Sequence, residues 1–102
     1  MIVGTCRIWL RLPENHSLKG KRQVIKSLLA RVHNRFNVAA AEVDDQDSWQ
    51  LVSLGFSCVS NDEAHAHEVI EKVVSFIRSE RPDMEFLDYR MEIVSALSGA
   101  RF

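Results

Sequence analysis

The sequence predicts an α+β domain in which two helices cover one face of a four-stranded antiparallel sheet. Three stretches alternate between apolar and polar residues, as strands with one buried face do, and two others place apolar residues three and four positions apart, as helices do. A further short segment completes the order strand, helix, strand, strand, helix, strand. This order is the split βαβ (βαββαβ), ferredoxin-like arrangement. Right-handed crossovers then place the first and third strands at the centre of the sheet.

The first half of the chain should form a strand and a helix. Residues 2–12 alternate, with Ile8 and Leu10 on the apolar parity, and a proline ends the strand. Ser17 is the expected N-cap of the helix, although Gly20 gives it no capping-box partner. The apolar stripe of this helix is Val24, Ile25, Leu28, Leu29, Val32 and Phe36.

The second half should add three strands and a helix. Residues 37–43 are rich in alanine, and we interpret them as a strand because they follow a finished helix; residues 49–59 alternate again. A capping box with Ser60 as N-cap begins a helix over residues 60–79, and residues 85–94 form the last strand. The expected core is Ile8, Leu10, Leu28, Val32, Leu54, Phe56, Val73, Ile77, Leu87 and Met91.

We expect one domain over residues 1–94 and a tail without a pattern over residues 95–102. The chain has 102 residues, and 46% of them are apolar, so it has enough apolar side chains to form a single hydrophobic core. No stretch approaches the roughly 20 apolar residues of a transmembrane helix, so no membrane partner is expected. The N-terminus has no signal-peptide features, and two cysteines do not form a disulfide framework. A cytoplasmic location is the simplest expectation.

The net charge of −1 conceals a strong asymmetry. Residues 1–41 contain eight Lys and Arg against one acid, whereas residues 42–102 contain five against thirteen. Because no acid lies between Asn15 and Ala41, the first helix should carry a basic face that suits a polyanion. The alternative is a solvated face whose charges pair with the acidic half. The expected RNA- or phosphate-binding residues are Ser17, Lys19, Lys21, Arg22, Lys26, Arg31 and Arg35.

The sheet face without helices is a second candidate surface. The first strand should present Arg7, Trp9 and Arg11 there, and Trp9 could stack on an RNA base. Small residues of the third strand weaken that interpretation and fit packing against a second copy equally well. A homodimer would use Val3, Trp9, Leu51 and Val59, with Asp88 and Glu92 as carboxylate partners for the arginines.

Catalytic and metal-binding chemistry has little support in the sequence. His65 and His67 are two positions apart on a helix and point in different directions. The loop at residues 13–20 lacks the glycines and the arginine of an acylphosphatase-type phosphate site, and no nucleophile–base set or nucleotide fingerprint is present. We therefore expect no enzyme activity, no metal and no cofactor.

Three separated motifs resemble one bacterial family. They are residues 16–28, residues 36–47 with Trp49-Gln50 after them, and residues 60–62. Together they resemble the YlxP-like proteins, a family of unknown function in which a Glu commonly stands at the position of Gly20. The resemblance implies a ferredoxin-like fold and a cytoplasmic bacterial protein. Family members are often encoded beside translation-initiation and ribosome-maturation factors, and no catalytic residues carry over.

These observations favour a non-enzymatic RNA- or ribosome-associated binding protein, linked to translation or ribosome maturation, that contacts phosphate through its first helix. One alternative is a protein–protein interaction module or a homodimeric structural protein that uses the open sheet face. A small phosphate-ester enzyme is a further alternative with weaker support, since the residues for such chemistry are missing.

Overall fold

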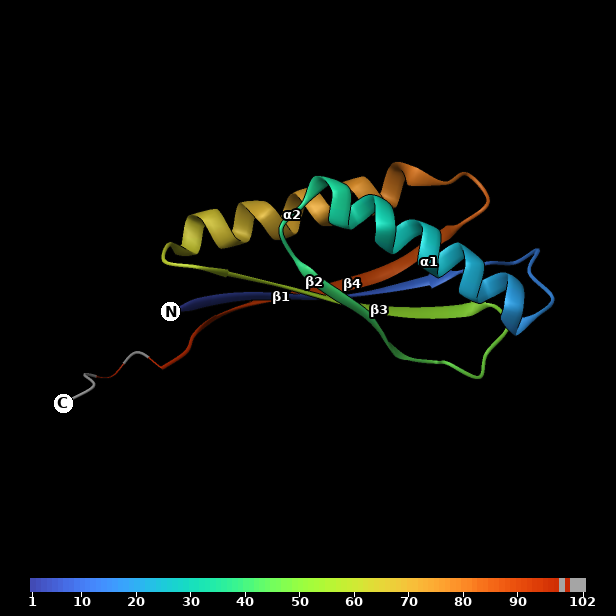
Figure 1. Ribbon diagram of the computed structural model, residues 1–102, viewed down its shortest axis with the longest axis horizontal. Helices are drawn as coiled ribbons and strands as arrows, with labels where there is room; N and C mark the ends of the chain where they lie inside the picture. The colour runs from blue at the N-terminus through green and yellow to red at the C-terminus, as the bar shows by residue number, and fades with distance from the viewer. Residues whose placement is uncertain (98, 100–102) are drawn as a thin grey trace.

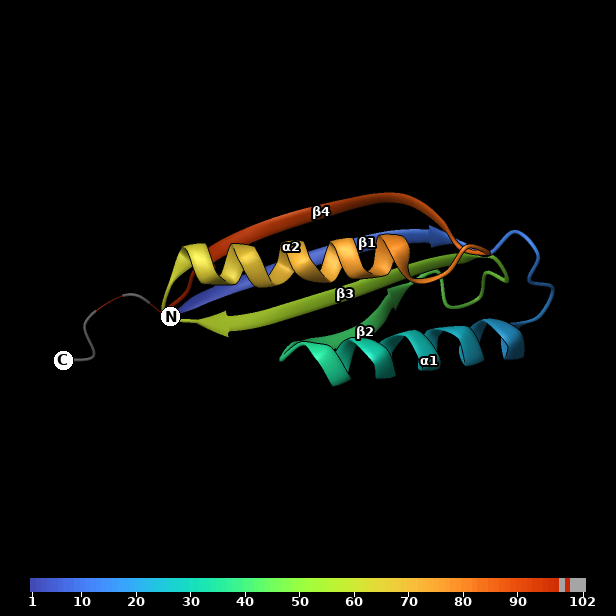
Figure 2. The same cartoon turned by 90° about the horizontal axis from the view of Figure 1, so that it is seen from above.

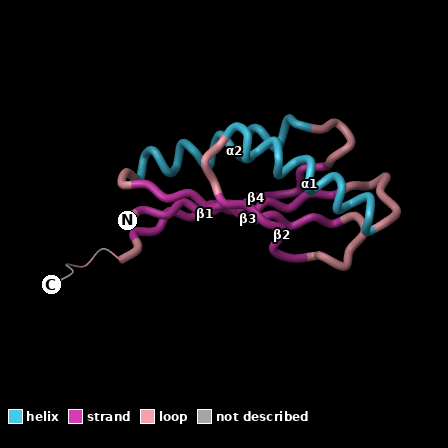
Figure 3. Tube along the Cα trace, in the orientation of Figure 1, coloured by secondary structure: helices cyan, strands magenta, loops and turns pink. Residues whose placement is uncertain are grey.

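The computed structural model describes residues 1–97 and residue 99. It contains the six expected elements in the expected order, and Figure 1 and Figure 3 show them. They are β1 (Ile2–Arg11), α1 (Leu18–Arg35), β2 (Ala39–Asp44), β3 (Leu51–Ser60), α2 (Glu63–Glu80) and β4 (Glu85–Ser95). The strands form one antiparallel sheet in the order β2-β3-β1-β4. The predicted α+β, ferredoxin-like fold is confirmed.

Both helices pack on the same face of the sheet (Figure 1). Seen from above, α2 runs over the central strands, whereas α1 lies beside the edge strand β2 (Figure 2). Because α1 lies at this margin, much of its surface stays exposed to solvent. The opposite face of the sheet stays open, and the side chains of alternate residues in β1, β3 and β4 point into it.

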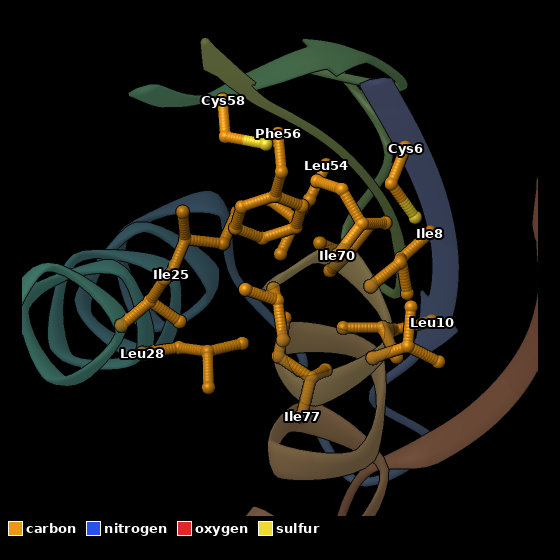
Figure 4. Packing of buried hydrophobic residues seen from close by; sticks show 14 of the residues in the cluster. Cys6, Ile8, Leu10, Ile25, Leu28, Leu54, Phe56, Cys58, Ile70 and Ile77 are labelled. Atoms are coloured by element: carbon orange, nitrogen blue, oxygen red, sulfur yellow. The ribbon is translucent and has the colours of Figure 1, made fainter. Parts of the chain in front are cut away.

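The hydrophobic core fills the space between the sheet and the helices (Figure 4). Ile8 and Leu54 on the central strands and Ile77 on α2 are fully buried. Eight of the ten expected core residues are buried, and Met91 packs against them while partly exposed. The apolar stripes of the helices therefore face the sheet, as their spacing predicts, because burial of these side chains drives the packing of helix on sheet.

The two helix starts follow different rules. Ser17 is the N-cap of α1, as expected, and its Oγ accepts a hydrogen bond of 2.9 Å from the Gly20 N–H. Helix α2 begins later than expected, since Asp62 is its N-cap and accepts from the His65 N–H at 3.2 Å. The prediction of Ser60 as N-cap was wrong because β3 continues through Ser60.

A bulge in β4 overturns one predicted core residue. Trp9 pairs with Asp88 and the next residue, Leu10, pairs with Phe86, so Leu87 has no partner in β1. Leu87 is 46% exposed, and Phe86 takes the position that faces the core. Strict alternation fails at a bulge, since the extra residue reverses the parity of everything before it.

Strand β4 continues into the segment that we expected to be a tail. Ser95 belongs to β4, and the Ala96 N–H donates a hydrogen bond of 2.8 Å to the Met1 carbonyl. Half of that expected tail, residues 98 and 100–102, lies outside the described residues. In the part of the chain that the structure describes, neither helix is long and apolar enough to cross a membrane.

Candidate functional site

The exposed side of α1 carries a row of basic side chains. Lys19, Arg22 and Lys26 lie three and four positions apart, so they share one face of the helix. All three are exposed, and within residues 1–97 and 99 none forms an ion pair with a carboxylate. His33 continues the same face one heptad further. At 1.5 Å per residue the row from Lys19 to His33 is about 20 Å long. We call these four residues the α1 basic row.

Lys21, in contrast, is buried and belongs to the inside of the protein. Its side chain is 1% exposed because it lies on the core-facing side of α1, four positions before Ile25. Its Nζ donates hydrogen bonds to the carbonyls of Asp45 and Ser48 and lies 3.1 Å from Glu42 Oε2. The assignment of Lys21 to an exposed phosphate-binding surface was therefore wrong.

Two other predicted phosphate ligands face α2. Arg31 donates to Glu80 Oε1 at 2.6 Å, and the Arg35 guanidinium lies 5.0 Å from the centre of the Phe76 ring. For Arg31 the alternative interpretation holds, since it pairs with the acidic half of the chain. Ser17 remains at the first turn, where it caps the helix. The predicted set thus separates into an exposed row, a buried lysine and two arginines that contact the second helix.

Arg7 organises the centre of the open sheet face. Its Nε donates to Ser53 Oγ at 2.9 Å, and its Nη2 donates to Asp44 Oδ2 at 3.0 Å. The guanidinium carbon lies 4.9 Å from the centre of the Trp9 ring. The pKa of the Asp44 carboxyl is lowered, first by the hydrogen bond from the Asp45 N–H and then by that from Arg7. One side of the Trp9 ring is thus already in contact with a cation of the same chain.

The second arginine of the open face also has its own partner. Arg11 Nε donates to Glu85 Oε2 at 2.9 Å. We expected Asp88 and Glu92 to serve the two arginines, but Asp44 and Glu85 do so within the chain. Arg7 and Arg11 are therefore neutralised by carboxylates of the same chain, and neither needs a phosphate as its partner.

A shallow hollow lies beside Arg7 on the same face. Its volume is about 770 Å³, and small side chains such as Thr5 and Ser57 line it together with Arg90. Val43 packs over Gly55, where a Cβ atom would lie 2.7 Å from Val43 Cγ1. Gly55 is therefore required for close contact between β2 and β3 rather than for ligand access.

The alternation pattern indicated no binding role for Trp49, which we expected in a strand and which lies in the loop between β2 and β3. In this loop Trp49 is 55% exposed, and its carbonyl accepts a hydrogen bond from Asn15 Nδ2. The loop lies beside the N-terminal end of α1 in Figure 1. One sequence feature pointed to this loop. The pair Trp49-Gln50 follows an acidic turn directly and belongs to a motif shared with the family, although the alternation of apolar residues does not explain it.

The described residues offer no group of three His, Cys, Asp or Glu side chains that could hold a metal ion. Cys6 and Cys58 are free and buried. Burial raises the pKa of the Cys6 thiol to about 11, so this sulfur stays protonated and unreactive near neutral pH.

Comparison with known proteins identifies the family of this chain. A family model described as "Protein of unknown function (DUF503)" matches residues 3–91. The chain belongs to this DUF503 family. A relative from Bacillus subtilis (strain 168), described as "Uncharacterized protein YlxP", is 43% identical over 63 residues, which cover 62% of this chain and 68% of the relative. The resemblance deduced from the three motifs is confirmed. The range matched by the DUF503 model contains the α1 basic row, the Trp49 loop and most of the open face, which continues beyond it in β4.

Proposed function

We propose that this DUF503 protein is a non-enzymatic RNA- or ribosome-binding protein of the cytoplasm that contacts phosphates through the α1 basic row. The observation that carries the proposal is the position of Lys19, Arg22 and Lys26. These cations share one exposed face, whereas Lys21, Arg31 and Arg35 each contact another part of the same chain.

Cations at the N-terminal end of a helix are slightly unfavourable unless an anion approaches. The first turn of α1 contains no acidic residue, and Lys19 and Arg22 lie near its positive N-terminal end. Cations there are repelled by the helix dipole by a few tenths of a kcal/mol each. A phosphate chain along the row would neutralise them and release its own counterions. The gene neighbourhood that the family resemblance implies points to ribosomal RNA as the source of such phosphates.

Filter binding to total ribosomal RNA tests this proposal. The double variant Arg22→Ala/Lys26→Ala should bind more weakly than the unmodified protein, and the slope of log K against log salt should fall by about 1.4–1.8 for two lost contacts. The matched control Lys72→Ala/Arg90→Ala removes two exposed cations elsewhere and should bind normally. If both double variants lose the same RNA affinity, binding depends on net charge alone, and this result would contradict a specific role for α1.

A homodimer through the open sheet face is a second candidate, and one observation favours it. Arg7 and Arg11 already have carboxylate partners within the chain, so a second copy would not bury unpaired cations. Val3 pairs with both Val59 and Val94, which gives an apolar row across three strands. Such a row contributes burial to a self-complementary interface.

Sedimentation over a roughly hundredfold concentration range tests the dimer. The unmodified protein should become heavier with concentration, and Val59→Asp should remain a monomer, because it places a charge in the apolar row. A protein that stays monomeric at the highest concentration excludes this candidate and leaves the RNA proposal unaffected.

A further inference from the structure

The loop between β2 and β3 presents large apolar side chains to solvent. Trp49 is 55% exposed and Leu51 is 41% exposed. Together with Arg11, Ser48 and Gln50 they line a shallow hollow of about 450 Å³. An exposed Trp at the edge of a hollow is typical of the anchor positions of protein interfaces, where a few aromatic residues supply most of the binding free energy.

The backbone that carries Trp49 is held from three sides. The Leu12 N–H donates to the Gln50 carbonyl at 2.8 Å, and Asn15 Nδ2 donates to the carbonyl of Trp49. The buried Lys21 ammonium donates to the Ser48 carbonyl at 2.8 Å. A loop with so many anchors loses little conformational entropy when a partner binds, so the exposed indole is preorganised for contact.

The turn that precedes Trp49 in the sequence is acidic. Three neighbouring ion pairs cancel their own charges: Arg7–Asp44, Arg11–Glu85 and Lys21–Glu42. Asp45 and Asp47, in the turn just before Trp49, take part in no ion pair within the described part of the chain. The turn before the exposed indole therefore carries two carboxylates that have no ion-pair partner among the described residues. We call Asp45, Asp47, Trp49 and Leu51 the Trp49 surface.

We propose that the Trp49 surface docks a basic protein segment. The segment places an apolar side chain against Trp49 and Leu51, and its Lys or Arg side chains lie near Asp45 and Asp47. The carboxylates attract such a segment and repel a phosphate backbone, so charge decides between a protein and a nucleic acid at this site. This surface differs in position and in sign of charge from the α1 basic row, and the inference does not depend on RNA binding.

The test uses the full chain and the fluorescence of Trp49. The variant Trp9→Phe leaves Trp49 as its single Trp. The probes are short synthetic peptides in which Leu or Phe is flanked by Lys and Arg, each paired with the same peptide carrying Glu at the basic positions. Basic peptides should shift the Trp49 emission and bind at least about tenfold more tightly than their acidic counterparts.

Three variants then locate the site. Trp49→Ala, measured by anisotropy of a labelled peptide, should lose about tenfold in affinity or more. Asp45→Asn/Asp47→Asn should bind more weakly and with less dependence on salt, and Asn suits the positive φ of 60° at Asp45. Val59→Ala, an exposed apolar residue at the other end of β3, should bind normally. Equal binding of acidic and basic peptides, or normal binding by Trp49→Ala, would overturn the proposal.

Discussion

The buried ammonium of Lys21 donates a hydrogen bond of 2.8 Å to the carbonyl of Ser48, so helix α1 holds the loop that presents Trp49. The same ammonium also reaches the Asp45 carbonyl and lies 3.1 Å from Glu42 Oε2. One charged side chain therefore joins a helix, an edge strand and a turn. Its contribution is structural, and this explains how a basic helix can contain a lysine that no external anion can reach.

Replacement of this lysine should destabilise the protein strongly. We expect Lys21→Met to lower the free energy of unfolding by about 3–5 kcal/mol, because the largely buried Glu42 carboxylate and the carbonyls of Asp45 and Ser48 would lose their partner. Lys26→Met, the same change at an exposed position, should stay within about 0.5 kcal/mol. The double variant Lys21→Met/Glu42→Gln should recover part of the loss. Urea unfolding measures all three, and a loss below about 1 kcal/mol for Lys21→Met would contradict this role.

The core should be equally sensitive at Phe56. This ring lies at the centre of β3 against the helices and is buried (Figure 4). Phe56→Ala should cost about 3–5 kcal/mol, a large part of the roughly 5–15 kcal/mol that stabilises a domain. Val59→Ala on the same strand should change stability little, since Val59 is 70% exposed. Thermal unfolding that shows similar small losses for both variants would contradict the position of Phe56.

The bulge in β4 places two adjacent residues in opposite environments, one packed against the core and one exposed. Phe86 packs against the core and lies under the Arg78 guanidinium at 4.4 Å, whereas Leu87 is exposed. We expect Phe86→Ala to cost about 2 kcal/mol or more and Leu87→Ala less than about 1 kcal/mol. Denaturant unfolding of the two variants gives the comparison. A larger loss of stability for Leu87→Ala than for Phe86→Ala would contradict the bulge and would support the unbroken alternation that the sequence predicts.

The buried thiol of Cys6 should make stability depend on alkaline pH. Burial raises the pKa of Cys6 from its usual 9.0 to about 11 in the folded protein. Between these two values the unfolded chain releases the thiol proton and the folded chain retains it, so stability is complete below pH 9 and is lost as the pH rises toward 11. The stability difference between the unmodified protein and Cys6→Ala should therefore shrink over this interval. A stability difference between the two proteins that does not change with pH would contradict the raised pKa of Cys6.

Most of the fold follows from the sequence because burial on this sheet is regular. The alternation of Ile8 and Leu10 and the spacing of Val73 and Ile77 each predict one buried face, and both are buried. The exceptions are places where local geometry overrides a period. Leu87 lies in a bulge, which alternation does not reveal. Ser60 fits a capping box, yet its backbone pairs with Ile2 in the sheet.

The candidate site was predicted less completely, since one helix carries basic residues with three different roles. Lys21 lies in register with Ile25 and Leu28, so the core-facing stripe itself contained the information that it is buried. Expecting lysine on the surface hid that signal. The roles of Arg31 and Trp49 depend on contacts with Glu80 and Asn15, which are distant in sequence and meet only in the folded chain.

Co-sedimentation with ribosomes tests the central proposal most directly. At about 50 mM salt the unmodified protein should sediment with ribosomes, and the bound fraction should fall steeply at about 200 mM salt. Arg22→Ala/Lys26→Ala should remain in the supernatant, whereas Lys72→Ala/Arg90→Ala should sediment like the unmodified protein. A protein that does not associate at the lower salt concentration, or an Arg22→Ala/Lys26→Ala variant that sediments normally, would contradict binding through the α1 basic row.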